Sequence, residues 1–111
     1  MNFPRTIYAI RHNPTGRIYV GSSAKPEARI RGHLNCLRRH DHSIPEMQED
    51  FIKYGEDYTF FNLGEIKRFD ERYLEYFWME FLRSRDPMYG YNIHDRSKPL
   101  NLADFPKIDI S

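Results

Sequence analysis

Cysteine is almost missing from this sequence, since Cys36 is the single one among 111 residues. One thiol cannot form an intrachain disulfide, and it cannot supply the several thiolates of a cysteine-based zinc site. Apolar runs are also short: none approaches the ~20 residues of a membrane-spanning helix, and the N-terminus lacks the pattern of a signal peptide. These absences favour a cytoplasmic protein of a reducing compartment, with no membrane partner.

Three common catalytic motifs are absent as well. The chain has no glycine-rich phosphate loop, no His-Glu-x-x-His zinc motif and no Gly-x-Ser-x-Gly nucleophile elbow. His40 and His42 lie two residues apart, which is not the spacing of a helical pair of metal ligands. The sequence therefore gives no support to P-loop nucleotide hydrolysis, zinc proteolysis or serine esterase chemistry.

Charge is unevenly distributed along the chain, although the net charge is only +1. Residues 1–45 hold eight Lys or Arg and two acids, whereas residues 46–111 hold nine basic and fourteen acidic residues, so the halves carry +6 and −5. A polarised domain of this size can bind phosphate on its basic side. Ordinary solvated faces are an equally good explanation of the charges alone.

The residue pattern predicts a small antiparallel sheet with helices. Strands are expected at residues 6–11, 17–21 and 58–63 with a short continuation to 66, and the Asn-Pro and Gly of residues 12–16 predict a hairpin turn. Apolar spacing predicts helices over residues 26–37, 43–54 and 70–85. The order β-β-α-α-β-α is typical of an α+β domain with a three-stranded antiparallel sheet flanked by helices.

Tyr8 and Tyr19 occupy corresponding places in the first two strands. Because successive strand residues point to opposite faces, Ile7 and Ala9 are expected on the face opposite Tyr8. By itself a strand tyrosine is more often a packing residue than a catalytic one.

The helix over residues 26–37 presents two distinct faces. Its buried stripe is predicted to consist of Ile30, Leu34 and Leu37, at spacings of four and three. Arg29 and His33 lie one turn apart on a neighbouring face. Either they form an exposed polar stripe, or they belong to a site.

The other two helices are marked by their ends. The segment from Ser43 to Glu46 has the spacing of a capping box at the start of the second helix. The third helix is expected to run from Asp70 to about Arg85, where Asp86-Pro87 would stop it. Its apolar face is expected to comprise Leu74, Phe77, Trp78, Phe81 and Leu82.

The two strands together resemble the signature of the GIY-YIG nuclease superfamily. Ile7-Tyr8 is followed by Ile18-Tyr19-Val20-Gly21, and ten residues separate Tyr8 from Tyr19. Arg29 and His33 follow Gly21 by eight and twelve residues, the offsets of the family's essential arginine and helix histidine. One departure is that the first motif begins with Thr6 where the family has glycine, and a strand start tolerates this exchange.

The resemblance continues into the second half of the chain. Glu75-Tyr-Phe-Trp is similar to the segment that carries the family's metal-binding glutamate, and Tyr89-Gly-Tyr-Asn92 is similar to the motif that ends its catalytic domain. The stretch around His42 is similar to a loop in the phage intron homing branch. The match implies a catalytic domain at residues 1–96 and a short tail at residues 97–111.

The resemblance implies a DNA endonuclease that uses one Mg²⁺ or Mn²⁺ per site, held by Glu75 through a hard carboxylate oxygen. It makes Tyr8 the general base, Arg29 the phosphate partner, His33 a helper of Tyr8, and Tyr19 an orienting group. A free phenol has a pKa near 10, so nearby cations such as Arg29 would have to lower it.

Further residues are expected to contact DNA, mostly its backbone. They are Lys25, Arg31, Arg38, Arg39, His42 and Asn92; for Asn92 a role in positioning the backbone around the site is the stronger alternative.

One site cuts one strand, so nicking by a monomer or a weak homodimer is expected, in the host cytoplasm if the chain is phage-encoded. The type of enzyme implied is a standalone nuclease from a phage or mobile element, or an excised catalytic domain. Rival interpretations are a non-catalytic nucleic-acid binder, an inhibitory partner protein that retains the fold, and an enzyme acting on branched DNA.

Overall fold

A three-stranded antiparallel sheet forms the middle of the protein. The computed structural model describes residues 4–67 and 73–94. Strand β1 spans Arg5–His12, β2 spans Ile18–Ser23 and β3 spans Tyr58–Ile66, in the sheet order β2-β1-β3. Within the described residues, no helix is long and apolar enough to cross a membrane.

The pairing of the strands decides which side chains become neighbours. Tyr8 lies opposite Gly21 of β2 and Asn62 of β3. The β1–β3 pairing shifts between Ile7 and Tyr8, where the bulge places an extra residue of β3 around Gly64. Bulges re-aim side chains, and this one lies directly beside the tyrosine of the first motif.

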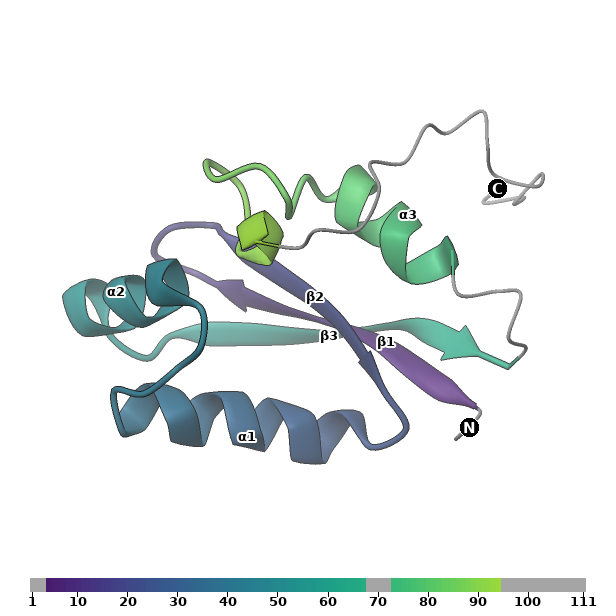
Figure 1. Ribbon diagram of the computed structural model, residues 1–111, viewed down its shortest axis with the longest axis horizontal. Coiled ribbons are helices and arrows are strands. Elements are labelled where there is room, and N and C mark those ends of the chain that lie inside the picture. Colours follow the sequence, from purple (N-terminus) through teal and green to yellow (C-terminus); the bar gives the residue numbers. More distant parts are fainter. Residues whose placement is uncertain (1–3, 68–72, 95–111) are drawn as a thin grey trace.

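Helices cover both faces of the sheet, as Figure 1 shows. Helix α1 spans Pro26–Arg38 and α2 spans Pro45–Tyr54, and both lie on the side of β1 from which Tyr8 projects. Helix α3 spans Tyr73–Phe81 and lies on the opposite face. The order β-β-α-α-β-α confirms the predicted α+β fold.

The alternation within β1 divides the core into two clusters. Ile7 and Ala9 pack with Val20, Ile66 and Met79 beneath α3. Facing α1 and α2, a second cluster contains Tyr8, Ile10, Leu37, Met47 and Tyr91. Ile30 and Leu34 pack against this second cluster, which confirms the predicted buried stripe of α1.

Two helix ends differ from the sequence prediction. The capping box was wrong: the residue before α2 is Ile44, no side chain caps the helix, and Pro45 occupies its first turn. Pro suits that position because its missing N–H would be unsatisfied there.

Helix α3 ends four residues before the predicted Arg85. Arg83 adopts a left-handed φ of 57°, and the N–H of Ser84 donates to the carbonyl of Met79. This pattern is a Schellman stop, usually made by glycine, so no glycine in the sequence signalled it. Phe81, the last residue of α3, is 65% exposed, so its predicted place on the buried apolar face was wrong. The predicted start at Asp70 lies outside the described residues.

The segment after α3 returns to the free edge of β2. Ile18 donates its N–H to Tyr89 and accepts from the N–H of Tyr91, so the segment runs beside the strand. A Cβ on Gly90 would lie 2.1 Å from the Cα and carbonyl oxygen of Ser84, so only glycine fits at that crossing. A 3₁₀ turn, η2, follows at Asn92–His94.

Candidate active site

The phenol of Tyr8 lies where β1, β2 and α1 meet. The side chain is only 2% exposed, and its ring is 6.3 Å from that of Tyr19. Gly21 makes room for both rings: a Cβ there would lie 2.7 Å from Tyr8 Oη and 2.9 Å from Tyr19 Cε2. The glycine of the second motif is therefore required by the two tyrosines.

Three side chains modify the Tyr8 phenol. His33 Nε2 lies 3.4 Å from Tyr8 Oη, and the rings of His33 and Tyr19 have their centroids 4.8 Å apart, with a tilt of 57° between them. Burial raises the pKa of Tyr8 above its ordinary value of 10.0, more than hydrogen bonding and charge from Arg29 lower it, and Glu75 raises it further. A role as general base would require nearby cations to lower the pKa of Tyr8. In the protein without substrate or metal, this pKa is raised instead.

Glu75 reaches the site from α3, on the far side of the sheet. Ser22 Oγ donates a 2.7 Å hydrogen bond to Glu75 Oε2, which ties the carboxylate to the end of β2. The effect of Glu75 on the pKa of Tyr8 reflects this proximity. Ser22 is a site residue that sequence analysis missed, although its place directly after Gly21 was a usable signal.

The donor set around Glu75 suits a hard cation that keeps most of its waters. A carboxylate and a neighbouring hydroxyl offer oxygens, the ligands that Mg²⁺ takes alongside water and phosphate. Within residues 4–67 and 73–94, no three His, Cys, Asp or Glu side chains gather into a cage. Glu75 and Ser22 therefore fit a metal held largely by water and substrate.

Two neutral histidines line the mouth of the site. Burial lowers the pKa of His33 to about 4, with smaller contributions from His42 and Arg29. Burial also lowers the pKa of His42. Both rings are consequently uncharged near neutral pH, and they act here through hydrogen bonds.

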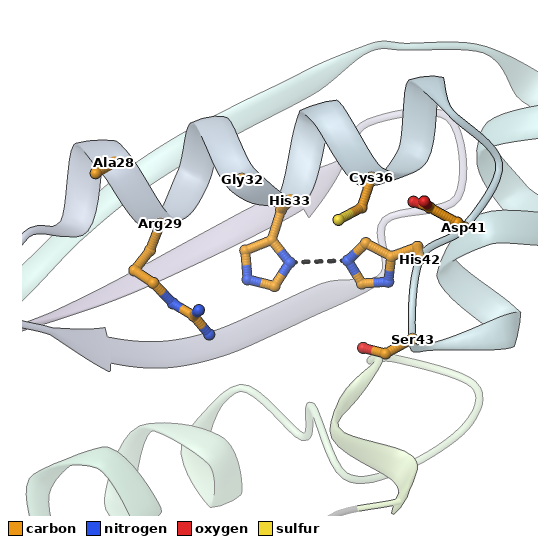
Figure 2. Close-up of a pocket in the computed structure, with 8 residues that line it drawn as sticks. All are labelled: Ala28, Arg29, Gly32, His33, Cys36, Asp41, His42 and Ser43. Carbon is orange, nitrogen blue, oxygen red and sulfur yellow. Dashed lines mark hydrogen bonds between the residues drawn. The ribbon is translucent and has the colours of Figure 1, made fainter.

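A cleft of about 270 Å³ opens beside these histidines. It is bordered by Arg29, His33 and Cys36 of α1 and by His42 and Ser43 of the following loop. Figure 2 shows Arg29 and His33 projecting from the same side of α1, with His42 reaching toward His33 from the loop. The cleft can admit a phosphate group next to Arg29.

The basic residues predicted to bind DNA differ in whether they are paired with an acidic side chain. Lys25 and Arg31 are exposed, and neither side chain has an acidic partner among the residues that the structure describes. The guanidinium of Arg38 instead donates a 2.7 Å hydrogen bond to each carboxylate oxygen of Glu56. Arg39 lies 3.3 Å from Asp41 in an exposed pair.

The side chain of Asn92 is buried and bonded to the backbone of β2. Its side chain is 6% exposed; its Oδ1 accepts from the N–H of Val20 at 2.8 Å, and its Nδ2 donates to the carbonyl of Val20 at 3.0 Å. The oxygen and the nitrogen of the side-chain amide thus both pair η2 with β2. The structure favours the positioning role that the sequence left open.

Comparison with known proteins places this arrangement among relatives. Residues 4–92 match the model of the GIY-YIG catalytic domain. Intron-associated endonuclease 1 of Enterobacteria phage T4 is 33% identical over 91 residues, which cover 80% of this chain and 36% of that protein. The chain therefore spans about a third of the length of this relative.

Two solved structures are also similar. One is the catalytic domain of intron endonuclease I-TevI, E75A mutant, with a TM-score of 0.71 and 28% identity over 89% of this chain and 98% of that one. The other is the catalytic domain of homing endonuclease I-TevI, with a TM-score of 0.69 and 30% identity over 78% of this chain and 95% of that one.

Proposed function

This chain belongs to the GIY-YIG family of catalytic domains, and we propose that it is a metal-dependent DNA endonuclease that cuts one strand per active site. The relative from phage T4 and the I-TevI domains are named as endonucleases. Residues 1–96 form the proposed catalytic domain, which acts as a monomer or weak homodimer in a nuclease of the phage or mobile-element type.

The convergence of four side chains from β1, α1 and α3 supports the proposal most directly. Arg29, His33 and Glu75 each act on Tyr8, and Arg29 also acts on His33. A base, a phosphate-binding fork and a metal carboxylate are the groups that phosphodiester hydrolysis needs. A pure binding surface has no use for the carboxylate beside the phosphate.

Each residue has a proposed part in the reaction. As a phenolate, Tyr8 takes the proton of the attacking water and becomes the neutral phenol. His33 stabilises the phenolate before this transfer, through its hydrogen bond to the oxygen. Arg29 pairs with phosphate oxygens at the mouth of the cleft, and it favours the ionised phenol by its charge. Tyr19 orients the water or phosphate beside His33.

Family members generally use a divalent metal. Glu75 would hold Mg²⁺ or Mn²⁺, and the ion would supply charge stabilisation for the leaving oxygen. Ser22 keeps one oxygen of Glu75 in a fixed direction, so the carboxylate is presented in one orientation. Lys25, Arg31 and Arg39 are proposed contacts to the DNA backbone.

The test is cleavage of supercoiled plasmid with Mg²⁺, with Mn²⁺ and with a chelator. The wild-type chain is expected to convert plasmid to open circles in either metal and to leave it intact in the chelator. Glu75→Ala should lose cleavage by at least about a hundredfold and retain DNA binding, since the ion stabilises charge by several kcal/mol.

Glu80→Ala is the matched control, because Glu80 lies on the same helix and pairs with Arg85. It should cleave at close to the wild-type rate. Early linear product would overturn nicking by a monomer in favour of paired cuts. Binding without cleavage in every metal would support the rival interpretation, a nucleic-acid binder that retains the fold.

A further inference from the structure

The loop between α1 and α2 determines where one histidine carries its proton. Ile44 donates its backbone N–H to His42 Nδ1 at 3.0 Å. A ring nitrogen that accepts a hydrogen bond carries no proton, so neutral His42 must be protonated on Nε2.

The position of the proton on His42 determines the position of the proton on His33. His42 Nε2 and His33 Nδ1 are 2.8 Å apart, as the dashed line in Figure 2 marks. Because His42 Nε2 carries the proton, it donates and His33 Nδ1 accepts. Neutral His33 is then protonated on Nε2, the nitrogen 3.4 Å from Tyr8 Oη.

A hydrogen bond donated in the opposite direction, from His33 to His42, conflicts with the hydrogen bond between Ile44 and His42. If His33 donated from Nδ1, His42 would have to accept on Nε2 and carry its proton on Nδ1. That proton would face the N–H of Ile44 at a separation of 3.0 Å, with two donors opposed. The backbone N–H of Ile44 therefore makes the relay run in one direction.

We propose that His42 is a positioning residue that holds His33 in the Nε2–H tautomer, so that His33 donates to the oxygen of Tyr8. The catalytic consequence of this inference rests on the proposed function, whereas the tautomer assigned to His33 rests on geometry alone. It gives His42 a role other than the phosphate contact expected from sequence. The lone pair of Tyr8 Oη that faces His33 is then used, and the phenol proton is directed elsewhere in the site.

The loop is built to hold His42 in this position. The N–H of His42 donates to Gln48 Oε1 at 3.0 Å, and Gln48 Nε2 donates to the carbonyl of Leu37 at 3.1 Å. The backbone of His42 is thereby fixed between the end of α1 and the start of α2.

Two substitutions separate the bonds that His42 makes. His42→Gln keeps a donor near the place of Nε2 and loses the acceptor for the N–H of Ile44. His42→Asn keeps an acceptor for that N–H, as asparagine does in turns, and loses the donor to His33. His40→Asn is the control, because His40 is exposed in the same loop and its φ of 60° suits asparagine.

The experiment uses the full chain labelled with ¹⁵N-histidine. Imidazole ¹⁵N–¹H spectra report the protonated nitrogen of His33, thermal unfolding reports the loop, and plasmid nicking in Mg²⁺ reports activity. Wild type and His42→Gln should show His33 protonated on Nε2. His42→Asn should shift the population toward Nδ1–H and slow nicking by about tenfold to a hundredfold, the usual loss when the partner orienting a functional histidine is removed.

The thermal stability of His42→Asn should be closer to that of the wild type than the thermal stability of His42→Gln, because only His42→Asn keeps an acceptor for the N–H of Ile44. A wild-type His33 protonated on Nδ1 would overturn the inference, as would an unchanged tautomer or an unchanged nicking rate in His42→Asn. If the wild type fails to nick DNA in any metal, the proposed function fails. The imidazole spectra would still decide the direction of the relay, so the two failures are distinguishable.

Discussion

At the residue scale, the site depends on how closely two tyrosines pack over one glycine. Tyr8 is almost fully buried, Tyr19 lies beside it, and Gly21 of the paired strand supplies the space for both rings. Burial gives the phenol a fixed position, and it also raises the pKa of Tyr8. The same packing therefore aids geometry and opposes ionisation, which Arg29 and a bound cation must offset.

Substitution Gly21→Ala tests this packing. The added Cβ would lie under 3.0 Å from atoms of both rings, so at least one ring must move. Overpacking of this kind costs about 1–3 kcal/mol of stability. Nicking should fall by about tenfold or more because the phenol is displaced, and unchanged nicking at unchanged stability would contradict the packing argument.

The low pKa of His33 predicts a pH-dependent stability. The folded value is about 4 and the ordinary value is 6.5, so between these pH values the unfolded chain binds more protons. The free energy of unfolding should therefore fall as the pH is lowered from about 6.5 to about 4, and the loss should level off below that. The difference is on the order of 3 kcal/mol at most, since each pKa unit corresponds to about 1.4 kcal/mol.

Urea unfolding across this pH range measures the effect. His33→Gln is the control, because glutamine removes the titration and keeps hydrogen-bonding groups. The stability difference between wild type and His33→Gln should narrow or change sign toward acid pH. Parallel curves for the two proteins would refute the assignment.

At the element scale, the segment after α3 is held by contacts with β2 and with its own beginning. The side-chain oxygen and nitrogen of Asn92 both bond the backbone of Val20, and Gly90 passes directly over the backbone of Ser84. Tyr91 donates to Asp50 of α2 at 2.7 Å, which joins the same segment to the other face. These contacts explain why a short irregular stretch is required for the fold.

Gly90→Ala should be among the most damaging single changes in the described chain. Its Cβ would overlap backbone atoms of Ser84 at 2.1–2.3 Å, and backbone cannot rotate away as a side chain can. We expect a loss of about 3 kcal/mol or more in the free energy of unfolding. Gly32→Ala is the matched control: it lies inside α1 with nothing within 4 Å, so it should stabilise the protein by about 0.5–1 kcal/mol. Comparable urea midpoints for the two variants would contradict this account.

At the scale of the whole molecule, the basic side is partly neutralised by the protein itself. Arg38 and Arg39 of the α1 end are paired with Glu56 and Asp41, whereas Arg31 has no acidic partner among the described residues. The +6 of residues 1–45 therefore overstates the charge available to phosphate. Because exposed pairs are worth little, DNA can still compete for these arginines at a cost.

The salt dependence of DNA binding separates free from paired arginines. For Arg31→Ala we expect the slope of log K against log salt to fall by about 1, the value for one lost phosphate contact. Arg38→Ala should change it less, because its guanidinium already holds both oxygens of Glu56. The measurement is a fluorescence titration of the Glu75→Ala protein at several salt concentrations, and equal changes in the two variants would argue against the distinction.

The local elements of this protein could be predicted because each is determined by residues close together in the chain. Alternation in β1 and helical spacing in α1 sufficed to predict their buried faces, and both were confirmed. Helix ends were less predictable: the left-handed turn at Arg83 depends on packing of the chain beyond it, and the residue itself gives no signal.

The sequence by itself determined the fold class, the family motifs and the candidate residues, because spacing and residue type are local properties. Only the tertiary structure decided what those residues touch. It placed Ser22 beside Glu75, paired Asn92 with Val20 and brought His42 to His33, although each pair is separated along the chain. It also decided the pKa of Tyr8, because desolvation depends on the atoms that surround a group in space, and sequence neighbours alone do not specify them.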